Sequence, residues 1–265
     1  MLSHSGVFVV CSAIFVLYLQ NISPGGGCSR VRCSKKRFRM NKLPEVTKNL
    51  LAINILMFLA TLVMQKQDTN LAATFGLHFF EASDFAPHQF VTYMFMHGGF
   101  SHLFFNMFAL YMFGSLLERV WGSKRFLIFY LVCGIGAGLL QEVAQYITYV
   151  QDGLNEVSFV RTSNGLVPMA DALNMWTTVG ASGAIYAILM GFAMSFPNER
   201  MFVFPLPFPI KAKYFVIGYA LIEFSLGVAH SNDGIAHYAH LGGMLFGLLL
   251  ILYWRKKRKI GGPYV

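Results

Sequence analysis

The sequence predicts an all-α, polytopic membrane protein with six transmembrane helices, and two observations support this fold class. Of its 265 residues, 55% are hydrophobic and only 12% are charged, whereas about a quarter of a typical soluble domain is charged. The hydrophobic residues also gather in runs of roughly 20, the length that spans a bilayer as a helix. This composition excludes a soluble enzyme, a secreted disulfide scaffold and a nucleic-acid-binding protein, despite the net charge of +9.

Apolar runs locate the six expected helices in order along the chain. They lie at roughly 47–66, 100–117, 126–149, 176–196, 214–231 and 235–254. Gly and Pro inside or beside these runs do not argue against helices, because the backbone must satisfy its own hydrogen bonds in lipid. We therefore expect a bundle of helices with little sheet.

The Lys and Arg residues predict the orientation of this bundle. With six spans, 19 of the 21 fall on one side of the membrane, and only Lys66 and Arg161 fall on the other. Cytoplasmic loops carry the excess of Lys and Arg, so both ends of the helical core are expected in the cytoplasm. The compact core favours a bacterial cytoplasmic membrane. We expect the lipid bilayer to be one partner of the protein, and we expect no binding of nucleic acid.

The chain divides into three expected regions. Residues 1–45 form an N-terminal extension that holds a short hydrophobic stretch and a basic segment, and Met40 competes with Met1 as the true start. Residues 46–255 form the membrane domain, and residues 256–265 form a basic cytoplasmic tail.

Polar side chains inside the expected spans are the first candidates for function, because lipid disfavours them. They are His102 and Asn106 in the second span, Ser182 and Tyr186 in the fourth, and His237 and His240 in the sixth. Asn106, Ser182 and His240 each lie about five to six residues from the outer end of their span, or roughly 8–9 Å deep. We therefore expect these three side chains to meet at one level, within reach of water.

This set of side chains predicts nucleophilic acyl transfer. A serine becomes nucleophilic when a base removes its proton, and we expect His240 to be that base near neutral pH. Asn106 and His102, together with the Ser182 backbone N–H, are expected to stabilise an oxyanion, and Tyr186 to hold the imidazole by packing. Acidic residues are absent from the fourth span and from the sixth after Asp233, so we expect a Ser–His pair without a carboxylate partner.

Small residues around these side chains predict close helix packing. Gly180 and Gly183 flank Ser182, and Gly243 and Gly247 follow His240 at helical spacing. Small residues let membrane helices approach closely, which would bring the hydroxyl and the imidazole together.

Three motifs in this order resemble the rhomboid family of intramembrane serine proteases. They are the string from His97 to Asn106 with the Glu118-Arg119 pair that closes the second span, the string from Gly180 to Tyr186, and Ala239-His240-Leu-Gly-Gly243. The resemblance covers about residues 45–255. It implies a six-helix core, membrane-anchored protein substrates cut near the outer face, Ser182 as nucleophile, His240 as base, and His102 and Asn106 at the oxyanion site.

The sequence is also compatible with two other functions. A catalytically silent membrane protein of the same architecture would bind client proteins, and a small transporter would use the intramembrane acids Glu142 and Glu223 to relay protons. The simpler interpretation of both acids is a neutral group or a hydrogen bond to a neighbouring helix. His97, His102, His237 and His240 lack a metalloprotease His-Glu-x-x-His string, so neither a metal nor another cofactor is expected, and His97 and His237 are expected to be solvated at the membrane boundary.

Overall fold

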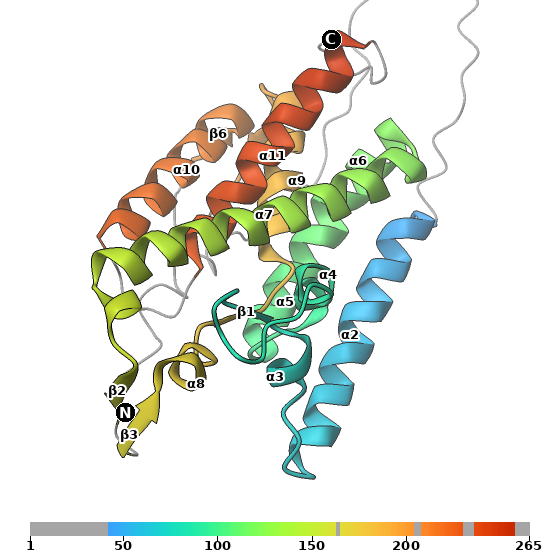
Figure 1. Ribbon diagram of the computed structural model, residues 1–265. Coiled ribbons are helices and arrows are strands. Elements are labelled where there is room, and N and C mark those ends of the chain that lie inside the picture. Colours follow the sequence, from blue (N-terminus) through green and yellow to red (C-terminus); the bar gives the residue numbers. More distant parts are fainter. Residues whose placement is uncertain (1–41, 163–164, 204–207, 230–235, 258–265) are drawn as a thin grey trace, which may run out of the picture.

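The computed structural model describes residues 42–162, 165–203, 208–229 and 236–257, and helices dominate them (Figure 1). The longer ones are α2 (Glu45–Gln65), a continuous rod of α5 (Phe100–Ala109), the π-helical η2 (Leu110–Gly114) and α6 (Ser115–Trp121), then α7 (Ser123–Gln151), α9 (Ser182–Ser195), α10 (Ala212–Val228) and α11 (His237–Lys256). Helix α2, the rod, α7 and α11 are long and apolar enough to cross a membrane. This finding confirms the all-α membrane class. Because α9 has 14 residues and α10 has 17, the number of six spans stays a prediction.

Shorter elements connect these helices. They are α3 (Leu71–Phe75), β1 (Leu77–His78), α4 (Gln89–Thr92), η1 (Tyr93–Phe95), η3 (Leu154–Glu156), β2 (Phe159–Thr162), β3 (Gly165–Pro168), α8 (Met169–Leu173), β4 (Thr177–Thr178), β5 (Arg200–Met201) and β6 (Ile210–Lys211). The strands form the antiparallel pairs β1–β4, β2–β3 and β5–β6. In the first pair, Leu77 lies opposite Thr178. This pairing fixes the segment that leads into α9.

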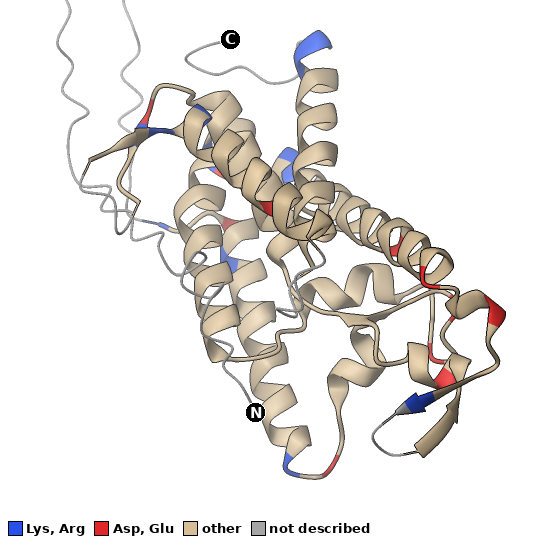
Figure 2. Ribbon diagram, turned by 90° about the vertical axis from the view of Figure 1, so that its left-hand side faces the viewer, with Lys and Arg blue, Asp and Glu red and all other residues tan. Residues whose placement is uncertain are grey.

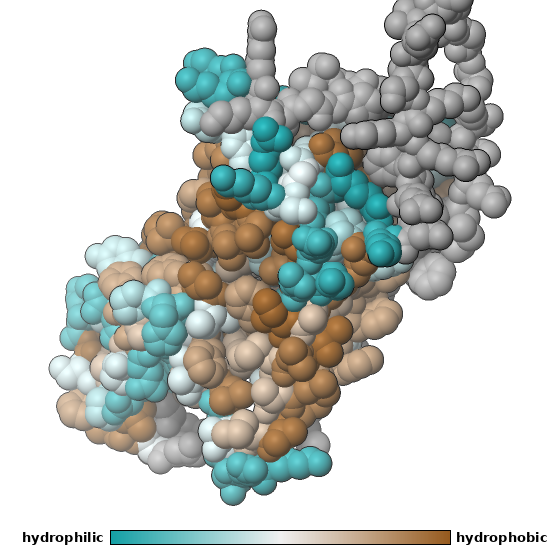
Figure 3. All heavy atoms as spheres, turned by 90° about the vertical axis from the view of Figure 1, so that its right-hand side faces the viewer, coloured by the Kyte–Doolittle hydropathy of each residue, from teal (hydrophilic) through white to brown (hydrophobic). Residues whose placement is uncertain are grey.

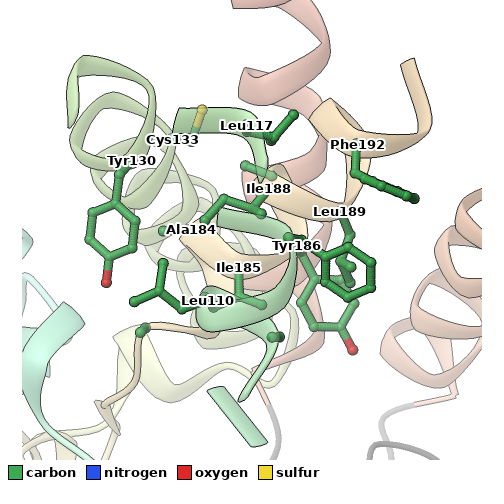
Figure 4. Close-up of a cluster of buried hydrophobic side chains, with 14 of the residues drawn as sticks. Leu110, Leu117, Tyr130, Cys133, Ala184, Ile185, Tyr186, Ile188, Leu189 and Phe192 are labelled. Carbon is green, nitrogen blue, oxygen red and sulfur yellow. The ribbon is translucent and has the colours of Figure 1, made fainter. Parts of the chain in front are cut away.

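Helix α9 lies at the centre of the bundle, in contact with α7, α10, α11 and the rod (Figure 1). Eleven of its 14 residues are buried, as expected of a helix that is apolar all round. Figure 4 shows its Ile188 in a cluster with Leu117 of the rod and Tyr130 of α7, all of which are fully or almost fully buried. The central position of α9 fixes the location of every side chain along it.

Helix α2 lies at the edge of the bundle, and its sequence explains why. Its buried residues are Thr47, Leu50, Asn54 and Phe58, which follow one helical face. The opposite face exposes large apolar side chains such as Leu56 and Leu59, and Figure 3 shows apolar residues between hydrophilic groups at the two ends. This surface suits contact with lipid rather than water.

Charged residues separate along the molecule. Figure 2 shows most Lys and Arg toward the end where α11 finishes, while Asp and Glu gather mostly around the far end of α7. The last turn of α11 holds Arg255 and Lys256. This distribution agrees with the charge pattern from which the orientation is inferred, and the orientation itself stays a prediction.

The carboxylate of Glu118 fastens the first turn of α2 to the corner between α6 and α7. It accepts hydrogen bonds from the backbone N–H groups of Val46 (3.0 Å) and Thr47 (2.7 Å). The hydroxyls of Thr47 (2.7 Å) and Ser123 (2.6 Å) donate to it as well. An acid at a helix N-terminus satisfies N–H groups that have no partner within the helix. The Glu118 side chain therefore serves helix packing rather than chemistry.

Glycine allows α11 to touch α9 and α7 at backbone distance. A methyl group added at Gly243 would overlap the carbonyl oxygen of Gly183, and one added at Gly247 would lie 3.1 Å from the Ala187 Cβ. On the other side of α11, a methyl group at Gly242 would lie 2.8 Å from the Leu140 Cβ. These positions leave no room for a side chain between the helices.

Candidate active site

Ser182 is the first residue of α9 rather than a residue one turn inside a helix. Strand β4 ends four residues before it, and Gly180 has a φ of +132°, a conformation that favours glycine. The Gly180 N–H donates to the Tyr93 carbonyl at 2.9 Å. The helix expected at 176–196 therefore begins six residues later, at Ser182. The expected depth of Ser182 assumed a helix from residue 176, so this depth is not supported. Gly180 is not a helix-packing residue, because it precedes the helix.

The Ser182 hydroxyl and the His240 imidazole are in direct contact across α9 and α11. Ser182 Oγ lies 2.9 Å from His240 Nε2, a hydrogen-bond distance. His240 lies in the first turn of α11, and that turn is held by Gln141 of α7, whose side-chain oxygen accepts from the Ala239 N–H at 3.2 Å. The sequence did not point to Gln141, although an amide inside an apolar helix is itself a signal. A histidine ring with its hydrogen at Nδ1 has a lone pair at Nε2, and at this distance such a lone pair can accept the serine proton.

Tyr186 packs its ring flat against the imidazole of His240. The ring centroids lie 4.1 Å apart, and the ring planes differ by 7°. Tyr186 lies one turn after Ser182 on α9, so both side chains point to the same side of the helix. Stacking of this kind limits the tilt of the imidazole.

An acidic residue from a third helix lies beside His240, contrary to the expected Ser–His pair without a carboxylate. Glu223 of α10 places Oε2 3.1 Å from His240 Nδ1 and 2.7 Å from His237 Nδ1. Its other oxygen accepts a hydrogen bond from the Tyr186 hydroxyl. The two spans that hold Ser182 and His240 have no acidic residue themselves. An intramembrane acid on a neighbouring span was the signal for this contact.

His97 and His237 are buried, and the expectation that both are solvated is wrong. Their exposed fractions are 5% and 4%. His97 lies in the loop before α5, with its ring 5.1 Å from the ring of His102. Burial, together with the nearby His102, lowers the pKa of His97 to about 3, because both effects disfavour the charged form. His97 is therefore neutral near pH 7.

His102 and Asn106 border the same cavity as Ser182, Tyr186 and His240, and this cavity has a volume of about 1100 Å³. The His102 ring lies against the backbone of Gly180, where an added methyl group would come within 2.8 Å of it. Asn106 is 6% exposed, and its Nδ2 has no hydrogen-bond partner among the described residues. A buried donor without a partner costs roughly 1–3 kcal/mol, which a group developing negative charge in the cavity would recover.

Among the described residues, one group of side chains has the composition of a metal site. Ligand atoms of Glu223, His237 and His240 all lie within 4.8 Å of one another. Around Zn²⁺, ligand atoms about 2.0–2.1 Å from the ion lie roughly 3.3 Å apart in a tetrahedron. The contacts of 2.7 and 3.1 Å between nitrogen and oxygen are shorter than this spacing. The geometry therefore fits direct contact of the three side chains better than ligation.

Glu142, the other intramembrane acid, lies in α7 and does not border the cavity. It is 5% exposed, and its Oε2 accepts a hydrogen bond from the Phe80 N–H at 2.9 Å. This contact links α7 to the loop after β1. The simpler interpretation, a hydrogen bond to a neighbouring segment, matches this geometry.

Comparisons with known proteins consistently find similarity to rhomboid proteins. A family model described as the Rhomboid domain matches residues 85–257. Rhomboid protease AarA of Providencia stuartii is 27% identical over 226 residues, which cover 82% of this chain and 74% of AarA. Rhomboid protease GluP of Bacillus subtilis is 29% identical over 212 residues, which cover 78% of this chain and 34% of GluP.

A relative from an organelle shares the same domain. Rhomboid protein 1, mitochondrial, of Saccharomyces cerevisiae is 29% identical over 169 residues, which cover 61% of this chain and 40% of that protein. The relatives thus come from bacteria and from mitochondria, so they do not fix which membrane holds this chain. The family model matches well over half of the chain. This chain therefore belongs to the rhomboid family.

Proposed function

We propose that this chain is an intramembrane serine endopeptidase that cuts membrane-anchored proteins in or near their transmembrane segment. The observation that carries the proposal is the 2.9 Å contact between Ser182 Oγ and His240 Nε2 at the wall of a cavity of about 1100 Å³. Two relatives whose names describe rhomboid proteases support it.

In the proposed reaction, His240 Nε2 takes the proton of the Ser182 hydroxyl while Oγ attacks the carbonyl carbon of the scissile peptide bond. The negative charge on the carbonyl oxygen is stabilised by the Asn106 amide, by the Ser182 N–H at the start of α9, and by His102. The His240 imidazolium then gives its proton to the leaving nitrogen, the C–N bond breaks, and water releases the acyl group from Ser182 by the reverse roles.

The substrate must be unwound at the cut, because a helix hides its own peptide carbonyls in hydrogen bonds. We expect a preference for helix-destabilising residues near the cut and for a small residue just before it, since glycine and alanine flank Ser182. With both ends of the core in the cytoplasm, the cavity would open toward the outer face.

A fluorophosphonate probe tests the proposal against the silent client-binding alternative. We expect the purified chain in detergent to be labelled at Ser182, because the probe reacts with a serine that a base activates. Mass spectrometry of the labelled peptide locates the adduct. Persistent absence of label at Ser182 in folded protein would favour the client-binding protein.

Replacing Asn106 by alanine is expected to lower kcat by about a hundredfold without abolishing cleavage, since the other oxyanion donors remain. The measurement is the steady-state cleavage of a transmembrane substrate in proteoliposomes. The matched control is Asn54→Ala, because Asn54 is also buried in a helix but donates to the Leu50 carbonyl and does not border the cavity. An unchanged kcat in N106A would remove Asn106 from the oxyanion site.

A further inference from the structure

Glu223 connects the two helices that hold the candidate site. It lies in α10, is 4% exposed, and contacts Tyr186 of α9 as well as His237 and His240 of α11. A buried carboxylate is costly unless donors surround it. All three contacts come from side chains at the wall of the cavity, so this acid serves the site rather than a remote helix joint.

The groups around the Glu223 carboxylate determine which histidine nitrogen carries a hydrogen. The Tyr186 hydroxyl donates to Oε1, and His237 Nδ1 and His240 Nδ1 both face Oε2. An ionised carboxylate is an acceptor only, so a nitrogen that hydrogen-bonds to it must bear the proton. The hydrogen bond of 2.7 Å therefore selects the Nδ1–H form of His237.

For His240, the choice of tautomer decides whether it is a base. Nε2 faces Ser182 Oγ at 2.9 Å, and Nε2 accepts a proton only when the neutral ring has its hydrogen at Nδ1. In the present geometry the 3.1 Å contact to Glu223 lacks the direction of a full hydrogen bond, and Nδ1 is buried without another hydrogen-bond partner among the described residues. A buried N–H without an acceptor is costly, so the carboxylate is the acceptor that the Nδ1–H form requires.

We propose that Glu223 is a positioning residue that holds His240 in the Nδ1–H tautomer, with the Nε2 lone pair toward Ser182. The role rests on the proposed peptidase function of Ser182 and His240. It makes the site a Ser–His–Glu set drawn from three helices, with the acid supplied by α10. Tyr186 contributes twice, since its ring stacks on His240 while its hydroxyl fixes the carboxylate.

A purely structural role for Glu223 predicts something different. If the acid only joined α10 to α11 through its 2.7 Å contact with His237, then removal of the His237 side chain would have the same consequences as removal of the carboxylate. If Glu223 acts on His240 directly, the His237 and Glu223 variants should differ in the tautomer of His240 and in kcat. The experiment is built on this difference.

The first measurement reads the tautomer without any need for activity. Full-length protein labelled with ¹⁵N-histidine is studied by NMR in lipid, and the His240 signals are those missing from His240→Ala. We expect the Nδ1–H form in the wild type and in His237→Ala, and the Nε2–H form in Glu223→Gln. The same tautomer in wild type and E223Q would overturn the proposal, even if the protein cleaves nothing.

The second measurement separates positioning from folding. In E223Q, kcat for a transmembrane substrate should fall at least about tenfold, while KM and the melting temperature stay close to the wild type. E223D, which keeps the charge, should recover most of the loss. Glu142→Gln is the matched control, because Glu142 is an equally buried acid that contacts the Phe80 N–H and does not border the cavity.

The outcomes keep the two proposals apart. A wild-type kcat in E223Q, with cleavage lost in Ser182→Ala, would overturn the role of Glu223 and leave the peptidase standing. An equal loss of kcat in His237→Ala and E223Q would also overturn it, since the effect would then pass through His237. Absence of cleavage in every variant, with an unlabelled Ser182, would reject the peptidase, and the NMR result would still decide the positioning role.

Discussion

Replacing Ser182 by alanine is expected to abolish cleavage of a transmembrane substrate, with a fall of at least about a thousandfold in kcat. The change removes the oxygen that lies 2.9 Å from His240 Nε2, so neither nucleophile nor proton donor remains for the base. His240→Ala should reproduce the loss, because the hydroxyl then has no base. The measurement is the kcat of purified protein in proteoliposomes with a fluorogenic transmembrane substrate.

The control for this experiment comes from the same helix. Ser195 is the last residue of α9 and is 4% exposed. Ser195→Ala makes the same chemical change in a buried position but at the opposite end of α9 from Ser182, so its kcat should match the wild type. Full turnover in S182A would reject the mechanism.

Gly243→Ala is expected to lower both the stability of the fold and the rate of substrate cleavage, although alanine is the better helix former. The added methyl group overlaps the carbonyl oxygen of Gly183, so α9 and α11 must move apart. Overpacking of this kind costs about 1–3 kcal/mol. Gly183 follows Ser182 directly and Gly243 lies three residues after His240, so the separation also lengthens the contact between the hydroxyl and the imidazole. Thermal unfolding and cleavage of the transmembrane substrate are measured on the same preparation.

Gly218→Ala is the matched control for the glycine prediction. Gly218 lies within α10, and an added methyl group would meet no heavy atom within 4 Å. In an open helical position, alanine is more favourable than glycine by about 1 kcal/mol. The two substitutions should therefore shift the melting temperature in opposite directions. A melting temperature for G243A equal to or above that of the wild type would show that the helices do not meet at Gly243.

The sequence predicted the helices well where composition alone determines them. Helix α2 was expected at 47–66 and lies at Glu45–Gln65, and α11 was expected at 235–254 and lies at His237–Lys256. Long apolar runs define such spans whatever their neighbours are. The prediction was poorest at the start of α9, because its first turn depends on the conformation of Gly180 and on the pairing of β1 with β4.

The contact between Ser182 and His240 followed from sequence, but the surroundings of His240 did not. Small residues on two helices indicate that those helices approach closely, whereas the side of α10 that faces the bundle depends on how all the helices pack. Apolar residues surround Glu223 in sequence, so no amphipathic pattern reveals its direction. Its contact with His240 becomes visible only in three dimensions, and so does the burial of His237.

The cavity also determines where the second reactant of a hydrolysis would come from. At the density of liquid water, about 1100 Å³ has room for on the order of thirty molecules. In the proposed reaction, water held in a cavity of this size beside Ser182 would not need to diffuse through hydrocarbon to release an acyl group. In that same proposed reaction, an occupant bulky enough to fill the cavity would exclude the water and stall release of the acyl group, so the acylated protein would accumulate.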